Sequence, residues 1–287
     1  MRREARADSG SLEHTFRERA APAGSPRYYA LLFAPPDVRP ALTALYAFDA
    51  EVRAAVHPRT EHAAAHLKLR WWQEEAGRMA QGSGLHPIGR ALSAAAQASG
   101  VDLACLPDYL VAAEHDLAGR PIADDEEFTA YCHRSGGLLQ QLAATLAQPA
   151  GERRAQVQRF GGALGRGLRM TELLRSLDFD LRSGRVRLPQ TRLSAYGVAA
   201  DSFLEAQPPA AARELLDELA AQAIGLVSQA LGQTLADRSR HRGALVLGEL
   251  ALVALRRMRA ARFAPQAASD PAGLVQLWRA WRTARRA

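Results

Sequence analysis

The sequence predicts an all-α fold in a single domain. Hydrophobic residues fill 48% of the 287 positions but aromatic residues only 6%, and long Ala- and Leu-rich stretches favour helices over strands. Apolar residues recur at helical spacing from Tyr28 onward, whereas no strand-like alternation and no internal repeat stands out. The length allows one large domain or two small ones, and the continuous helical pattern favours one.

The helices can be placed in chain order from their apolar periodicity and from the prolines and glycines that bound them. Residues 1–24 mix charged residues with Ser, Gly and Pro, so we expect a flexible N-terminal arm there, with room for one helical turn. Helices are then expected at about 28–34, 37–57 and 67–79, from 86, at 107–119, from 128, at 159–181, from 201, at 213–235, at 245–263 and at 274–286.

Four glycines lie inside the long helix expected at 159–181, at positions 161, 162, 165 and 167. Glycine costs about 1 kcal/mol relative to alanine inside a helix, so this cluster needs a structural reason. Close packing of another helix or the approach of a bulky ligand would supply one.

The net charge of +7 comes almost wholly from arginine, because Lys68 is the only lysine. Arginine is suited to bidentate contacts with phosphate or carboxylate, which favours an anionic partner such as a diphosphate or a membrane surface. A genome rich in Arg and Ala codons is a simpler cause of the same composition. No recognisable nucleic-acid motif occurs, so no nucleic-acid partner is expected.

Cysteine and histidine patterns give little support for a metal site. Cys105 and Cys132 form no CxxC pair, so we expect two small buried hydrophobic side chains. His62 and His66 have the i,i+4 spacing that can bind zinc, but no third ligand is evident, and solvated or capping side chains are expected.

No apolar run reaches the length of a bilayer span, and the N-terminus carries charges where a signal peptide would have an apolar core. We therefore expect a cytoplasmic protein that is at most peripheral to the inner membrane. Residues 264–287 predict an amphipathic helix rich in Arg and Trp, with an apolar stripe of Leu274, Leu277, Trp278 and Trp281. Such a helix can dock on the protein's own core, the commoner arrangement, or lie in a membrane interface.

Several short stretches together resemble one known family. They are YYALLFAPP at 28–36, LRWWQEE at 69–75, EHDL at 114–117, YCHRSGG at 131–137 and LLRSLDFDLRSGRVRLP at 173–189. In this order and spacing, over residues 25–260, the chain resembles squalene and phytoene synthases. The resemblance implies a single-domain isoprenoid synthase fold in residues 25–263, a helical bundle around a central cavity.

In active members of that family, two facing helices each present an Asp-rich motif to an apolar cavity. The resemblance implies that the carboxylates hold Mg²⁺ ions, which bind the diphosphates of two prenyl donors and assist their departure. A diphosphate is too highly charged to leave without such neutralisation, and the resulting carbocation needs a dry pocket.

The first motif should carry three acids at the positions of Arg53, Ala54 and His57, and none of the three is an acid. Two of them can be cationic, which opposes the binding of metal ions. Asp49 lies one helical turn before Arg53, and an i,i+4 ion pair is the simplest interpretation of that face.

The second motif should carry acids at the positions of Ser176 and Asp180, of which only Asp180 remains. Glu172 lies two turns before Asp180 on the same face, whereas Asp178 points about 160° away. A remade Mg²⁺ site would use Asp180 and Glu172 as metal ligands, with Asp49 or Asp116 as a further donor. Asp180 would then be the catalytic residue.

A metal-free site is the other possibility. In that case Arg53, Arg175 and Arg185 would clamp a diphosphate directly through charge-assisted hydrogen bonds. Binding alone would not supply the activation of the leaving group that divalent ions provide.

The missing acids of both motifs resemble a branch of the same superfamily that includes the mitochondrial complex I assembly factor with a phytoene-synthase-like domain. This resemblance implies a non-catalytic protein that binds a prenyl diphosphate or another isoprenoid lipid, or that serves a respiratory-complex assembly partner. The alternative is an active Mg²⁺-dependent transferase that joins two farnesyl or geranylgeranyl diphosphates head to head. Whether the protein is an enzyme stays open, and four missing acids out of five favour the first hypothesis.

Overall fold

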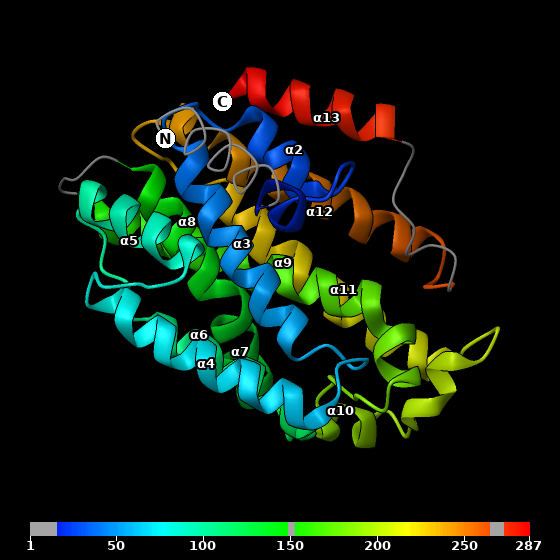
Figure 1. Ribbon diagram of the computed structural model, residues 1–287. Coiled ribbons are helices and arrows are strands. Elements are labelled where there is room, and N and C mark those ends of the chain that lie inside the picture. Colours follow the sequence, from blue (N-terminus) through cyan, green and yellow to red (C-terminus); the bar gives the residue numbers. More distant parts are fainter. Residues whose placement is uncertain (1–15, 149–152, 265–272) are drawn as a thin grey trace.

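The computed structural model describes residues 16–148, 153–264 and 273–287, and in these ranges the protein is built from helices (Figure 1). No strand forms among them, and the all-α prediction is confirmed. The α-helices are α2 (Pro26–Phe33), α3 (Arg39–Ala55), α4 (His62–Ala80), α5 (Pro87–Ser99), α6 (Leu106–Ala118), α7 (Asp125–Cys132), α8 (Leu138–Ala147), α9 (Arg154–Arg182), α10 (Gln190–Ala195), α11 (Ala210–Leu231), α12 (Arg242–Ala260) and α13 (Gly273–Arg286).

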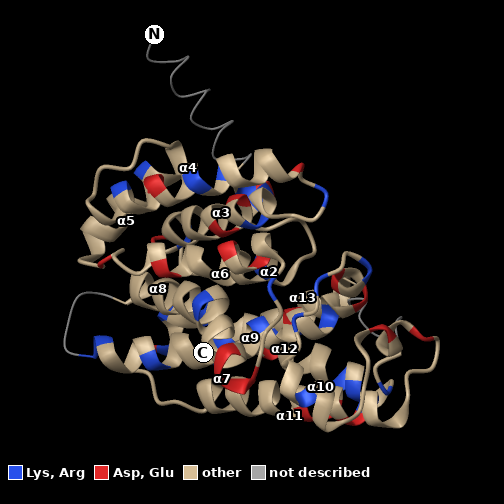
Figure 2. Cartoon of the chain, turned by 90° about the horizontal axis from the view of Figure 1, so that it is seen from below, with Lys and Arg blue, Asp and Glu red and all other residues tan. Residues whose placement is uncertain are grey.

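Helix α9 runs through the middle of the bundle (Figure 1). Its 29 residues pack mainly against α8 and α11, and also against α12. Helix α3 packs against α5, α4 and α8, while α4 also contacts α6. On the other side of the molecule α12 packs against α2 and α13. Figure 2 shows basic and acidic residues interspersed on most of the labelled helices.

Local sequence signals explain where several helices begin and end. Ser25 caps α2 by accepting a hydrogen bond from the Tyr28 amide, and Pro26 follows at the first helical position. Asp124 caps α7 in the same way, and three acids follow in its first turn. Gly100 and Gly119 adopt the left-handed conformation that ends α5 and α6.

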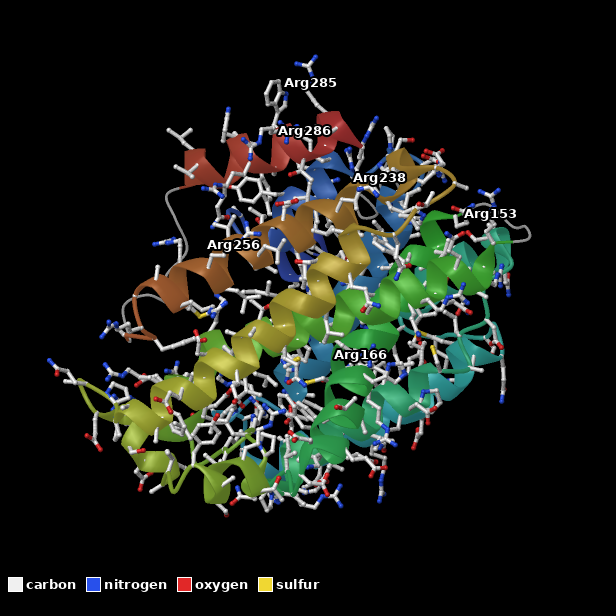
Figure 3. The ribbon with its side chains drawn as sticks, turned by 180° about the vertical axis from the view of Figure 1, so that it is seen from behind. Arg153, Arg166, Arg238, Arg256, Arg285 and Arg286 are labelled. Atoms are coloured by element: carbon white, nitrogen blue, oxygen red, sulfur yellow. The ribbon has the colours of Figure 1, made fainter. Side chains whose placement is uncertain are left out.

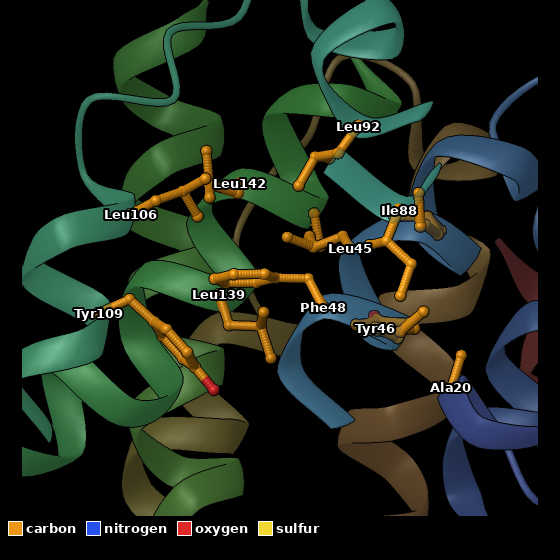
Figure 4. Close-up of a cluster of buried hydrophobic side chains, with 14 of the residues drawn as sticks. Ala20, Leu45, Tyr46, Phe48, Ile88, Leu92, Leu106, Tyr109, Leu139 and Leu142 are labelled. Carbon is orange, nitrogen blue, oxygen red and sulfur yellow. The ribbon is translucent and has the colours of Figure 1, made fainter. Parts of the chain in front are cut away.

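The largest hydrophobic cluster joins α3, α5, α6 and α8 (Figure 4). Phe48 is fully buried at its centre and meets the ring of Trp72 edge to face, with 5.4 Å between ring centroids. A second cluster lies between α9, α11 and the segment around α10. The two clusters hold α3 and α9 in fixed positions on either side of the site described below.

The glycines of α9 serve close helix packing. A Cβ atom at Gly165 would lie 2.2 Å from the backbone oxygen of Gly136, and one at Gly161 would lie 2.4 Å from the oxygen of Gln140. A Cβ at Gly167 would lie 2.6 Å from the side chain of Val227 on α11. Close packing of another helix, one of the two expected reasons for these glycines, is therefore present at all three positions.

Two segments differ from the expected pattern. The helix expected from about 201 is a short 3₁₀ turn, Ala200–Leu204, and Pro208-Pro209 follow soon after, which disfavours continuation of a helix. Residues 16–20, inside the arm predicted over 1–24, are helical, and Ala20 and Ala21 are buried in the core. The short helical segment agrees with the single turn expected in the arm, whereas Ala20 and Ala21 are buried because small apolar side chains pack there; residues 1–15 lie outside the described ranges.

Replacing Gly165 with alanine should destabilise the protein by about 1–3 kcal/mol, because the new methyl group meets backbone rather than a flexible side chain. Gly225→Ala in α11 is the matched control, since no atom lies within 4 Å of its Cβ position. The control should stabilise the protein by up to about 1 kcal/mol through helix propensity. Urea denaturation of both variants measures the difference, and equal stabilities would contradict the packing described here.

Candidate functional site

Two adjoining hollows lie beside α9. The first, which we call the apolar cavity, has a volume of about 330 Å³; its lining combines aliphatic side chains, mostly of α8, α9 and α12, with polar ones that include Arg19 and Arg27. The second, the arginine cleft, measures about 450 Å³ and opens at one end of α9. The two hollows share four lining residues, Arg53, Arg169, Glu172 and Arg175. A long ligand could therefore place an apolar tail in one and a polar head in the other.

Asp49 is the buried anchor of the site, with no exposed surface. Its carboxylate lies 2.5 Å from a guanidinium nitrogen of Arg27 on α2 and accepts a hydrogen bond of 2.8 Å from Nε of Arg53. The hydroxyl of Tyr109 on α6 also donates to it. Burial opposes ionisation, but Arg27 and Arg53 together hold the pKa of Asp49 well below its usual range. The i,i+4 ion pair predicted for Asp49 and Arg53 is confirmed.

Arg53 connects α3 to α9. Its Nη1 donates to Oε2 of Glu172 at 2.9 Å while its Nε remains on Asp49. Glu172 accepts a second hydrogen bond of 3.0 Å from Arg169 on its own helix. Burial raises the pKa of Glu172, but Arg53 and Arg169 outweigh it and hold that pKa at about 2. The carboxylates of Asp49 and Glu172 are therefore both ionised and already paired with arginines.

The far side of the arginine cleft repeats the pattern. Arg187 donates to Asp116 at 2.9 Å and to Asp180 at 2.7 Å. The hydroxyl of Ser176 donates to the other oxygen of Asp180 at 2.7 Å, and that of Tyr131 donates to Asp116 at 2.9 Å. Asp180 is thus held between an arginine and a hydroxyl rather than directed at another carboxylate.

All five residues predicted for the site line the arginine cleft. They are Arg53, Arg175, Arg185, Glu172 and Asp180. Arg185 donates to the Val56 carbonyl at 2.6 Å, and among the described residues no carboxylate lies within ion-pair distance of it. Burial lowers the pKa of its guanidinium. Asp178 faces away, as expected, and pairs with Arg182 at the surface.

Three arginines that pair with the site's carboxylates, Arg27, Arg169 and Arg187, were not predicted from the sequence. Arg169 lies three residues before Glu172, a spacing that signals a contact along one helix. Arg187 lies beyond the turn at Gly184, and its pairs with Asp116 and Asp180 leave no pattern in the local sequence. Arg27 gives no local pattern either, because its contact with Asp49 joins two separate helices, α2 and α3.

The other candidate metal ligands do not gather into a site. His62 and His66 lie with their Nε2 atoms 3.0 Å apart on an exposed turn of α4. Within the described ranges, no group of three or more His, Cys, Asp or Glu side chains is arranged to hold a metal ion. Cys105 and Cys132 are free thiols, and burial raises the pKa of Cys132 to about 12.

The sequence matches the squalene/phytoene synthase family over residues 20–280. The chain belongs to this family. Relatives include the phytoene synthases of Mycobacterium bovis and Mycobacterium tuberculosis, each 25% identical over 171 residues. These alignments cover 60% of this chain and 55% of each relative, so the chain spans little more than half the length of those proteins.

Solved structures of family members have the same helical architecture. A dehydrosqualene synthase in complex with a ligand matches with a TM-score of 0.82 and 20% identity, over 99% of this chain and 96% of the other. Squalene synthase HpnC from Alicyclobacillus acidocaldarius matches with a TM-score of 0.76 and 18% identity, over 89% and 94% of the two chains. At these identities the likeness establishes the fold, and the predicted isoprenoid synthase bundle is confirmed.

Replacing Asp49 with asparagine should lower the free energy of unfolding by about 3–5 kcal/mol, because Arg27 and Arg53 lose their shared carboxylate in a buried setting. The matched control is Asp178→Asn, which removes an exposed i,i+4 pair and should cost at most about 0.5 kcal/mol. Urea denaturation near pH 7 measures both. Similar small losses in the two variants would show that Asp49 does not organise the site.

Proposed function

We propose that this protein binds an isoprenoid-type lipid with an anionic head group and does not ionise it. The apolar cavity takes the hydrocarbon chain, and the arginine cleft takes the diphosphate or a similar anion. The observation that carries the proposal is the charge around the cleft, which is lined by five arginines and three carboxylates, a difference of two positive charges.

The cavity has the chemistry that a terpenoid chain requires. Leu139, Leu168, Leu247 and Leu250 contribute to its walls, and its volume of about 330 Å³ is near the lower end of the usual range for ligand pockets. Burying each methylene group of a hydrocarbon chain there is worth about 0.8 kcal/mol. The tail would supply affinity, and the arginine cleft would select ligands with an anionic end.

Magnesium fits this set of side chains poorly. Mg²⁺ needs one or two free carboxylates and octahedral oxygen ligands, whereas Glu172, Asp116 and Asp180 each lie against an arginine. A metal ion would have to displace Arg53 or Arg187 and would leave that guanidinium unpaired beside it. We therefore assign the anion to arginine alone and derive no step through a metal ion.

Binding of this kind does not favour departure of a diphosphate. An interaction accelerates a reaction only if it strengthens in the transition state, and Arg53, Arg169 and Arg187 are held on protein carboxylates that do not change during a reaction. The runner-up function, head-to-head joining of two prenyl diphosphates, would require these pairs to open. The family's phytoene synthases give that alternative its support. An assembly role with a respiratory complex stays a prediction from the sequence.

Arg185→Ala should weaken binding of farnesyl thiodiphosphate, a non-hydrolysable probe, by about tenfold or more, because it removes a charge-assisted contact to the anion. Arg182→Ala is the matched control, since Arg182 lies three residues away and pairs with Asp178 outside the cleft. Isothermal titration in the presence of EDTA measures both affinities. Equal affinity of the two variants, or no binding without Mg²⁺, would overturn the metal-free site.

A further inference from the structure

Helix α13 docks on the bundle through its small side chains. Ala280 and Ala284 are buried against α2 and α12. Gln276, one turn earlier on the same face, is 2% exposed and lines the apolar cavity. The hydroxyl of Tyr29 on α2 donates to the carbonyl of Gly273 at 3.0 Å and fixes the first turn. Small residues allow the helix to approach its neighbours closely, so this face is the one that packs.

The bulky face of α13 is therefore left outward. Leu274 is 81% exposed, Trp278 52% and Trp281 44%, and Val275 and Leu277 are exposed as well. These five account for five of the twelve exposed large hydrophobic side chains in the described parts of the chain, on a helix of 14 residues. Such a concentration on one element marks a contact surface rather than scattered surface residues.

The charge on α13 is of one sign. The helix carries four arginines, at positions 279, 282, 285 and 286, and no acidic residue. The guanidinium of Arg282 lies 4.6 Å from the centre of the Trp278 ring, and that of Arg285 lies 4.9 Å from the Trp281 ring. Arg285 projects away from the body of the protein (Figure 3). The exposed face thus combines tryptophan rings with cations directly beside them.

We propose that the outward face of α13 binds the surface of an anionic phospholipid bilayer. Tryptophan and leucine side chains enter the boundary between head groups and acyl chains, while arginines beside them meet lipid phosphates. Each arginine near such a surface is worth about 1 kcal/mol. A second copy of this chain is a poorer occupant, because it would bring four more arginines against the same face.

The contact involves one face of a helix and not a membrane span. Among the described helices, none is both long and apolar enough to cross a bilayer. The same contact would set the end of the apolar cavity beside the lipid, because Gln276 on the inner face of α13 lines that cavity. The proposal goes beyond ligand binding and does not depend on it.

The test is co-sedimentation of the full chain with phosphatidylcholine vesicles that contain about 30% phosphatidylglycerol. The protein should bind these vesicles, bind pure phosphatidylcholine at least tenfold more weakly, and lose most binding in about 0.5 M salt. Trp278→Ala with Trp281→Ala, and separately Arg282→Glu with Arg286→Glu, should each weaken binding about tenfold or more. The four substituted side chains are all exposed to solvent, so the thermal unfolding midpoint of each variant should stay unchanged.

The matched control is Leu67→Ala with Arg70→Glu, two exposed residues of α4, which lies away from α13 in Figure 1. This control should bind vesicles like the unaltered protein. Absence of binding to anionic vesicles, or an equal loss in the control and the α13 variants, would overturn the proposal. It would also be overturned by sedimentation velocity showing self-association that the two tryptophan substitutions abolish while vesicle binding persists.

Discussion

The site depends on one chain of ion pairs, from Asp49 through Arg53 to Glu172, which crosses from α3 to α9. Asp49 has no exposed surface, so its charge is tolerable only with Arg27 and Arg53 in contact. That constraint places the guanidinium of Arg53, at a position where the first motif should carry an acid, between α3 and α9. Removing Arg53 would break the link between the two helices and leave Asp49 with Arg27 alone and Glu172 with Arg169 alone.

This fixed charge explains how two chemically different hollows can adjoin. Aliphatic side chains of α8, α9 and α12 line the apolar cavity, and the shared arginines form the boundary where the cleft begins. Because the pKa of Glu172 is held at about 2, its carboxylate stays ionised across neutral pH.

Much of this could be predicted from the sequence, and the limits have physical causes. Helical periodicity predicts the all-α fold, and the i,i+4 spacing predicts the pair of Asp49 with Arg53. Contacts between separate helices, such as that of Arg27 with Asp49 or of Arg53 with Glu172, leave no local pattern in the sequence. The same limit holds for α13: periodicity identifies its two faces, but packing decides that Ala280 rather than Trp278 faces inward.

The most direct test of the account is the release of pyrophosphate when the purified protein is incubated with farnesyl or geranylgeranyl diphosphate and Mg²⁺. A fixed guanidinium between ionised carboxylates should leave no means of activating the leaving group, so release should not exceed that of a protein-free control. Mg²⁺-dependent release that accompanies a squalene- or phytoene-like product, and that Asp180→Asn abolishes, would contradict the account.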